Sequence, residues 1–139
     1  MKKKVLIIGL VLLAGFATSA VAADKRMKKV VDDALDFSVK QSMSMYGVMK
    51  DQKGILPRSA KDGEMITCES GWWTSGFYPG TLWYCYEYSN DPQIRAAAEE
   101  MTSRVEKQKY TTSNHDVGFI INCSFGNGYR LTHNEAYRE

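Results

Sequence analysis

The sharpest chemical signature in the sequence is His-Asp-Val-Gly-Phe, at residues 115–119. We expect Asp116 to stand at a helix start, where free backbone N–H groups and the helix dipole hold a carboxylate ionised and in place. His115 beside it carries the side chain whose charge changes near neutral pH. Gly118 leaves room for a ligand to approach the backbone. The plain alternative is an Asp116 that only caps the helix, an exposed His115 and a Gly118 that serves packing.

A second candidate is the aromatic block over residues 72–88. Trp72 and Trp73 are adjacent, so they cannot both point into one core from a helix. One of them is therefore expected to face a cavity, where a flat ring with a polar edge can stack on the apolar face of a sugar. The alternative is that the whole block belongs to the core.

Carbohydrate hydrolysis normally uses two carboxylates at a set separation. Asp116 supplies one, and Glu69 or Glu87 are candidate partners near the aromatic block, although Glu87 also suits a solvated helix face. The sequence contains no phosphate-binding glycine loop, no GxSxG and no HExxH motif. His115 and His133 form no zinc pattern with the cysteines, so we expect neither a metal nor a cofactor.

The chain has an odd number of cysteines, Cys68, Cys85 and Cys123, and none forms a CxxC pair. We interpret them as small apolar residues of the interior. One disulfide between Cys68 and either of the others stays open as an alternative.

Helical signals recur along the chain. Apolar residues at spacings of three and four predict an amphipathic helix over residues 27–46. A second helix is expected around Pro79, because proline suits a first helical turn. Asp91 and Pro92 predict the N-cap and first residue of a third helix, and the short link between the two favours an antiparallel pair. The third helix has an apolar stripe of Ile94, Ala97, Ala98, Met101 and Val105.

The rest of the chain reads as a long polar loop over residues 50–63 and two further helices. One helix is expected to start at Asn114 or Asp116 and to end at residues 126–128, where glycine and asparagine tolerate a left-handed conformation. Thr132 and Glu135 have capping-box spacing and predict a new helix start. The total is about five helices.

The first 22 residues have the pattern of a secretory signal peptide. Three lysines precede an apolar run over residues 5–16, and Ala20-Val21-Ala22 matches a small-x-small cleavage site. A membrane anchor is the alternative, but about a dozen apolar residues fall short of the roughly 20 that span a bilayer. The sequence therefore predicts export to the periplasm and a mature chain of residues 23–139, with no membrane segment once the signal is removed.

Composition limits the function classes. The 139 residues carry a formal charge of +2, and without residues 1–22 there remain 15 basic against 16 acidic residues, a charge of −1. This balance offers no electrostatic argument for a nucleic-acid partner. With 44% hydrophobic and 12% aromatic residues, the chain does not read as disordered.

The motifs together resemble glycoside hydrolase family 88, the unsaturated glucuronyl hydrolases. Three blocks carry the resemblance, at residues 73–83 (WTSGFYPGTLW), 115–119 (HDVGF) and 124–129 (SFGNGY). It covers roughly residues 71–137 and the leading helix. The resemblance implies an all-α fold, a six-hairpin (α/α)6 toroid of alternating inner and outer helices. The present chain would be its N-terminal portion, truncated after about five helices.

The resemblance also implies a reaction. Polysaccharide lyases leave a C4–C5 double bond on the non-reducing uronic acid, and these hydrolases hydrate that bond so that the unsaturated sugar is released. No metal or organic cofactor takes part. Asp116 matches the first of two catalytic aspartates, Trp73 matches the aromatic residue at the mouth of the pocket, and His115 is assigned to substrate binding. The second aspartate belongs to a later motif of the type Ile-Asp-x-Met-x-Asn, which these 139 residues do not contain.

The leading hypothesis is thus a hydrolase of unsaturated uronic-acid oligosaccharides of the glycosaminoglycan type. Its nearest rival is an unsaturated rhamnogalacturonyl hydrolase that acts on pectin fragments in a similar toroid. A third alternative is an inactive truncated product that only binds sugar, because a toroid of about a dozen helices cannot close with five. The 139-residue chain alone is expected to be inactive, and the sequence leaves its oligomeric state open.

Overall fold

The computed structural model describes the backbone of residues 2–138 and the side chains of residues 24–138. The chain divides into two units, Met1–Phe37 and Ser38–Glu139. The side chains of the expected signal peptide, residues 1–22, lie outside the described ones, and cleavage after them stays a prediction. Within the described residues, no helix has the length and apolar character needed to cross a bilayer.

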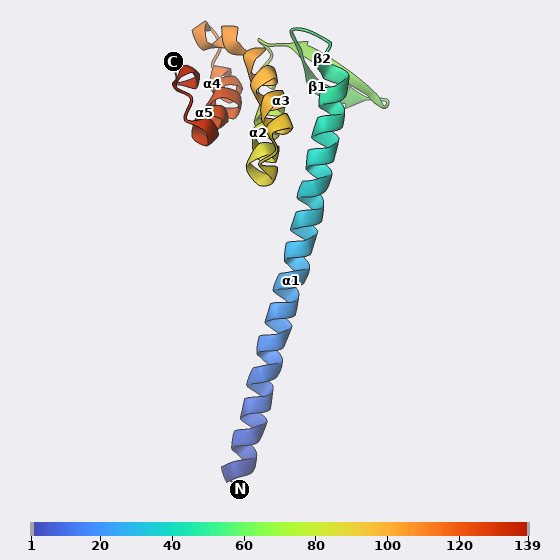
Figure 1. Ribbon diagram of the computed structural model, residues 1–139, viewed down its shortest axis with the longest axis vertical. Helices are drawn as coiled ribbons and strands as arrows, with labels where there is room; N and C mark the ends of the chain where they lie inside the picture. Colours follow the sequence, from blue (N-terminus) through green and yellow to red (C-terminus); the bar gives the residue numbers. More distant parts are fainter. Residues whose placement is uncertain (1, 139) are drawn as a thin grey trace. The chain divides into compact units, whose positions relative to one another are not determined.

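Helices dominate the described residues, and one β-hairpin interrupts them (Figure 1). The first helix runs through the first unit into the second. A 3-10 turn follows the third helix, a π-helical segment joins the last two, and a second 3-10 turn ends the chain. The elements are α1 (Lys2–Met49), β1 (Ile55–Lys61), β2 (Glu64–Glu69), α2 (Phe77–Ser89), α3 (Pro92–Ser103), η1 (Glu106–Tyr110), α4 (Val117–Ile121), η2 (Asn122–Gly126), α5 (Asn127–Thr132) and η3 (Glu135–Tyr137).

The helix expected over residues 27–46 is confirmed as part of α1. Between residues 24 and 37 the apolar side chains of α1 are exposed, Met27 and Val30 among them, and two ion pairs of i,i+4 spacing follow its polar face. In the second unit, by contrast, Ser42 and Met49 of α1 are buried. Among the described side chains of α1, those of the last turns therefore contribute to a core.

Arg104 holds the carboxyl end of α1. Its guanidinium donates hydrogen bonds to the carbonyl oxygens of Met49 and Lys50 and to those of Gln52 and Ile55, at 2.8–3.2 Å. Glu100 pairs with the same side chain at 2.9 Å, and only 4% of the Arg104 side chain is exposed. These bonds satisfy carbonyl groups that a helix end leaves without partners, so they attach α1 and the start of the hairpin to α3.

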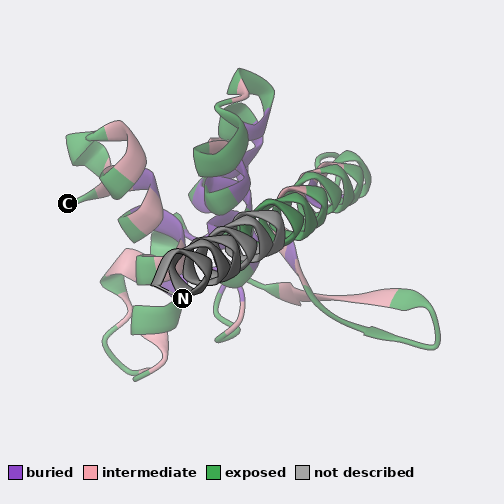
Figure 2. Ribbon diagram, turned by 90° about the horizontal axis from the view of Figure 1, so that it is seen from below, coloured by how far each residue is buried: buried purple, intermediate pink, exposed green. Residues whose placement is uncertain are grey.

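The expected loop over residues 50–63 is wrong in its second half. Residues 55–61 form β1, which pairs antiparallel with β2. The turn between them is Asp62-Gly63, and both residues have positive φ, 53° and 84°. Asp-Gly is a preferred pair for the tight hairpin turn that requires two positive φ angles. The exposed tip of the hairpin is visible in Figure 2.

The expected helix pair is confirmed as α2 and α3, which pack against each other (Figure 1). Pro79 lies in the first turn of α2. Asp91 caps α3, since its side chain accepts a hydrogen bond from the Gln93 N–H at 2.8 Å. The residues of the predicted stripe are all buried, and Ala97, Ala98 and Met101 share one core cluster with Leu82 and Trp83 of α2. Val105 follows the end of α3 and belongs to a second core cluster.

The end predicted at residues 126–128 is wrong, because the helical backbone continues from α4 through the π-segment η2 into α5. It stops at His133, which takes the left-handed conformation with φ 53°. Gly128 serves packing instead. A Cβ atom there would lie 2.8 Å from the Tyr137 ring and 3.0 Å from the Trp83 ring.

The capping box predicted from Thr132 to Glu135 does not form. Asn134 caps the short turn η3, and its side chain accepts a hydrogen bond from the Ala136 N–H at 3.2 Å. The Thr132 hydroxyl donates to the Gly128 carbonyl and accepts from the Asn134 N–H. Thr132 thus closes the preceding helix rather than opening a new one.

Two glycines at the start of α2 allow close contact with the backbone of α4 and η2. A Cβ atom at Gly76 would lie 2.6 Å from the Ile120 Cα, and one at Gly80 would lie 2.7 Å from the Cys123 carbonyl oxygen. Real Cβ atoms do not approach backbone this closely, so any larger residue separates the two helices. This contact sets the first of the three sequence blocks that carry the resemblance against residues 120–123, which join the other two blocks.

Replacing either glycine therefore has a sharp expected effect. Gly76→Ala and Gly80→Ala are each expected to cost about 1–3 kcal/mol of unfolding free energy, because the added methyl group meets rigid backbone. Gly47→Ala is the matched control, since a Cβ atom at Gly47 in α1 would have no neighbour within 4 Å. Alanine there should stabilise the helix by about 0.5–1 kcal/mol. Urea unfolding followed by circular dichroism measures all three, and equal stability of Gly76→Ala and Gly47→Ala would contradict the packing argument.

Candidate active site

Asp116 precedes α4, but its carboxylate does not cap that helix. No backbone N–H of the helix donates to its side chain, so the expectation of a carboxylate held by helix N–H groups is wrong. The reason is the Asp116 backbone, which is helical (φ −79°, ψ −4°), whereas a capping residue such as Asp91 is extended (φ −77°, ψ 121°). The Asp116 carboxylate is therefore not used in closing the helix end.

The backbone of Asp116 is nevertheless held on both sides. Its N–H donates to the Asn114 side-chain oxygen at 2.9 Å, and its carbonyl accepts from the N–H groups of Phe119 and Ile120. The side chain is 28% exposed, and its Oδ1 lies 3.3 Å from Nε2 of His115, whose side chain is 93% exposed. The site thus offers a half-buried carboxylate beside an imidazole that a ligand can reach.

Gly118 is the second residue of the same helix and lies next to open space. A Cβ atom there would meet only the Asn122 amide nitrogen, at 4.0 Å. Packing in the described structure therefore does not require glycine at this position, in contrast to Gly76 and Gly80. The room beside Gly118 remains available to a ligand.

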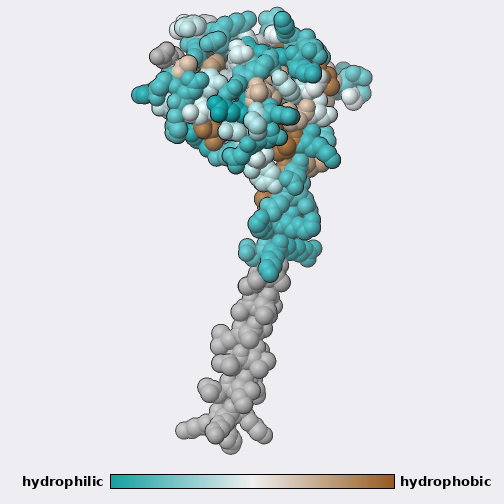
Figure 3. Space-filling model, viewed as in Figure 1, coloured by the Kyte–Doolittle hydropathy of each residue, from teal (hydrophilic) through white to brown (hydrophobic). Residues whose placement is uncertain are grey.

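An aromatic cluster connects the two sequence motifs. Trp73, Phe77 and Phe119 meet edge to face, with ring centroids 5.6–6.3 Å apart. All three rings are exposed, by 42%, 39% and 51%, which is unusual for three touching aromatic side chains. The structure thereby brings Trp73 against the third residue after Asp116. Apolar side chains of the second unit also emerge as small brown patches on the face drawn in Figure 3.

The two adjacent tryptophans have different surroundings. The Arg58 guanidinium lies over the Trp72 ring, 3.8 Å from its centroid, so one face of Trp72 is occupied by a cation. Trp73 contacts only aromatic rings among the ring contacts recorded for described residues. Of the two, Trp73 is the better candidate for stacking on a sugar.

The candidate partner carboxylates do not join Asp116. Glu87 makes two hydrogen bonds to Arg130, at 2.6 and 2.7 Å, and this guanidinium lowers the pKa of the Glu87 carboxyl. The pair ties α2 to α5 on the surface. Glu69 is exposed at the end of β2. Neither residue has the environment of a second catalytic carboxylate.

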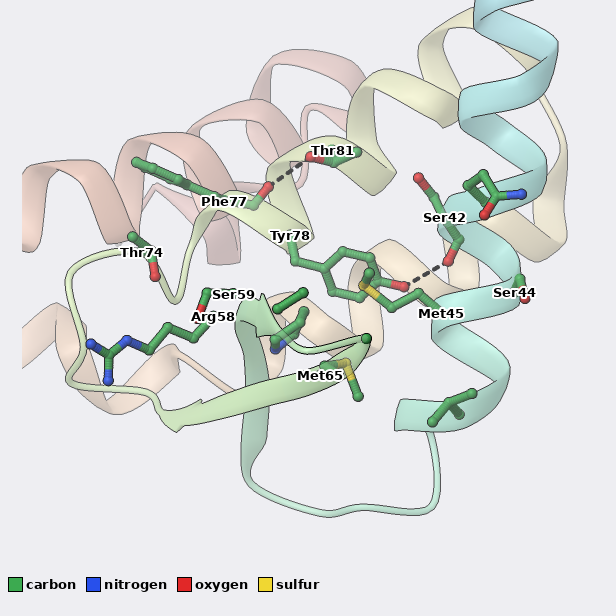
Figure 4. A pocket seen from close by; sticks show the side chains of 15 residues that line it. Ser42, Ser44, Met45, Arg58, Ser59, Met65, Thr74, Phe77, Tyr78 and Thr81 are labelled. Carbon is green, nitrogen blue, oxygen red and sulfur yellow. Dashed lines mark hydrogen bonds between the residues drawn. The ribbon is translucent and has the colours of Figure 1, made fainter.

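A cavity of about 680 Å³ lies between the last turns of α1, the hairpin and the start of α2 (Figure 4). Phe77 borders both this cavity and the aromatic cluster, whereas Asp116, His115 and Trp73 are not among the lining residues. Sequence reasoning missed Arg58 and Thr74, which line the cavity. The only local signal for Arg58 was a cation in a short strand after a proline.

All three cysteines are free thiols, but the expected interior position is confirmed only for Cys85, because Cys68 and Cys123 are half-buried. Cys85 is buried, and partial burial raises the pKa of the Cys68 and Cys123 thiols. Among the side chains that the structure describes, no group of three or more could hold a metal ion.

Comparison with known proteins defines the class. No family model matches the chain. An unsaturated glucuronyl hydrolase of Formosa agariphila is 42% identical over 65 residues, 47% of this chain and 16% of the relative. An unsaturated chondroitin disaccharide hydrolase of Streptococcus pyogenes serotype M1 is 30% identical over 114 residues, 78% of this chain and 28% of the relative. A solved structure of an unsaturated glucuronyl hydrolase specific for heparin matches with TM-score 0.65 and 38% identity, over 76% of this chain and 29% of that one.

The resemblance to the unsaturated glucuronyl hydrolases is thereby confirmed, and the helices are those of part of an (α/α)6 toroid. The chain spans 16% and 28% of the lengths of the two curated relatives.

The unused carboxylate of Asp116 leads to a stability test. Asp116→Ala should change the unfolding free energy by no more than about 0.5 kcal/mol, as a partly exposed substitution without a cap to lose. Asp91→Ala removes a real cap and should cost about 1 kcal/mol. Thermal unfolding of both variants provides the comparison. An equal loss in the two would show that Asp116 is kept as a helix cap.

Proposed function

We propose that these residues belong to a glycoside hydrolase that removes the unsaturated uronic acid from lyase-generated oligosaccharides by hydrating its C4–C5 double bond. One observation carries the proposal. The contact of Trp73 with Phe119 places a candidate sugar-stacking ring beside the segment that holds Asp116. Because the helices meet backbone to backbone at Gly76, this placement is rigid.

Asp116 has the surroundings for an electrostatic role. Protonation of the double bond creates positive charge on the sugar ring, and a half-buried carboxylate next to the ring would stabilise that charge. His115, with its ring nitrogen 3.3 Å from the carboxylate and its side chain in solvent, can donate a hydrogen bond to the substrate. The general acid and base that the resemblance implies is a second aspartate outside these 139 residues.

We assign the substrate to the glycosaminoglycan type. The two curated relatives are named for unsaturated glucuronyl groups and for chondroitin disaccharide, and the matching solved structure is described as specific for heparin. The pattern of residues 1–22 supports export, so we place the reaction in the periplasm, where lyase products of imported polysaccharides can accumulate.

The role of Asp116 is tested on the longest product of the reading frame that contains these residues. Loss of absorbance near 235 nm (roughly the enoate band) reports turnover of an unsaturated chondroitin disaccharide. Asp116→Asn should lower kcat by about 10²–10³ or more and leave binding intact, because it removes only the charge. Glu87→Gln, which changes the same group in a surface ion pair, should retain turnover.

Three results would change the assignment. Unchanged turnover in Asp116→Asn would remove this residue from the mechanism. Faster turnover of an unsaturated rhamnogalacturonan disaccharide would reassign the substrate to pectin. A reading frame that stops at codon 139, with sugar binding and no turnover, would leave a binding function alone.

Trp73 can be tested on the 139-residue chain by its affinity for the same disaccharide. Trp73→Ala should weaken binding by about 1–2 kcal/mol through loss of the stacked ring. Tyr110→Ala removes another exposed ring, at the end of η1, and should leave the affinity unchanged. Isothermal titration measures both. Equal affinities of Trp73→Ala and the unaltered chain would refute stacking at this residue.

A further inference from the structure

Arg58 differs from the other arginines of the second unit. Arg95, Arg104, Arg130 and Arg138 each lie within ion-pair distance of a carboxylate. Among the described residues, Arg58 has neither an ion pair nor a hydrogen bond, and its recorded contact is the Trp72 ring. The side chains that the structure describes therefore provide no carboxylate to neutralise its charge.

The backbone and the tryptophan hold this cation in place. Arg58 is the residue at which the register of β1 shifts against β2, between Pro57 and Ser59. Such a bulge re-aims a side chain away from the regular alternation of the strand. Stacking on Trp72 then restrains the planar guanidinium while its N–H groups stay available for an acceptor.

The surroundings of Arg58 have the chemistry of a small-molecule site. Arg58 lines the cavity of about 680 Å³ and extends along its edge in Figure 4. Thr74 lines the same cavity, and its hydroxyl is buried without a hydrogen-bond partner among the described residues. The lining also includes polar and apolar residues, among them Gln41, Ser44, Ser59, Met45, Met65 and Phe77.

We propose that Arg58, stacked on Trp72, binds an acidic group of the oligosaccharide, a sulfate or a carboxylate, in this cavity. The planar fork of a guanidinium suits the oxygens of either group, and Thr74 can supply one further hydrogen bond. Phe77 connects the cavity to the Trp73 cluster, so a sugar stacked there can extend toward Arg58. The proposal rests on the proposed function and adds to it a subsite that recognises the negative charge of the substrate.

The test titrates the 139-residue chain with unsaturated chondroitin 6-sulfate disaccharide and with its unsulfated counterpart, at low ionic strength. Arg58→Gln should weaken binding of the sulfated sugar about tenfold, the effect of losing a charge-assisted hydrogen bond. Arg58→Lys, which keeps the charge without the planar fork, should lose less. Arg95→Gln is the control, because it removes an exposed arginine of α3 that pairs with Glu99.

The two sugars distinguish the sources of the acidic group. A loss confined to the sulfated sugar identifies sulfate, and an equal loss for both identifies the uronic carboxylate. Unchanged affinity of Arg58→Gln for both sugars overturns the proposal. Thr74→Val, which keeps the shape and removes the hydroxyl, should weaken binding a few-fold and provides a second variant if Arg58→Gln is unstable in thermal unfolding.

A titration with inorganic sulfate separates this proposal from the function of the whole site. The indole N–H signal of Trp72, assigned with Trp72→Phe, should shift on addition of sulfate in the unaltered chain and not in Arg58→Gln. A shift without any disaccharide binding would reject the proposed function and keep the anion site. Disaccharide binding that does not depend on Arg58, with no shift on addition of sulfate, would reject the anion site and keep the proposed function.

Discussion

The structure depends on a contact between two helix backbones. Gly76 and Gly80 have no side chain, so the backbone of α4 at Ile120 and of η2 at Cys123 lies directly against the start of α2. Side chains at an ordinary helix interface can repack, but backbone against backbone has no such freedom. The separation and rotation of the two helices are thereby set, and with them the meeting of Phe119 with Trp73 and Phe77. Of the motifs at residues 73–83 and 115–119, which both contain glycine, only the first needs it for close packing.

Local signals predicted the elements that depend on local chemistry. Asp91 and Pro92 mark the start of α3 because a cap and a first-turn proline act within a few residues, and the stripe of α3 repeats with the helix itself. The same reasoning predicted a helix end at residues 126–128 that does not occur, because glycine is found both at helix ends and at sites of close packing. Here glycine serves close packing, because the rings of Trp83 and Tyr137 lie against it. Trp83 is far away in sequence and Tyr137 follows across a turn, so neither contact could be predicted locally. The turn at Asp62 was readable, but the polar residues around it concealed the hairpin.

The candidate site divides in a similar way. The motif order placed Trp73 and Asp116 in one site, and the aromatic cluster is consistent with that expectation. The manner in which Asp116 is held was not predictable, because its helical backbone angles follow from Asn114 and the turn before it. Arg58 could not be identified as a site residue from the sequence. Its candidate role depends on stacking with Trp72, fourteen residues later, and on the absence of a carboxylate among its described neighbours.

Three features of the site do nothing for the fold. The Asp116 carboxylate caps no helix, Gly118 relieves no close contact, and the cluster of Trp73, Phe77 and Phe119 leaves large apolar rings exposed. Asp91, Gly76 and the buried stripe of α3 show the corresponding rules at work elsewhere in the second unit, where a carboxylate caps a helix, a glycine allows a close backbone contact and apolar side chains fill the core. Proteins break such rules mainly where function requires it. The three departures lie along one segment, residues 116–119, and the loop that meets it, which is the part of the chain where the proposed function places the bound sugar.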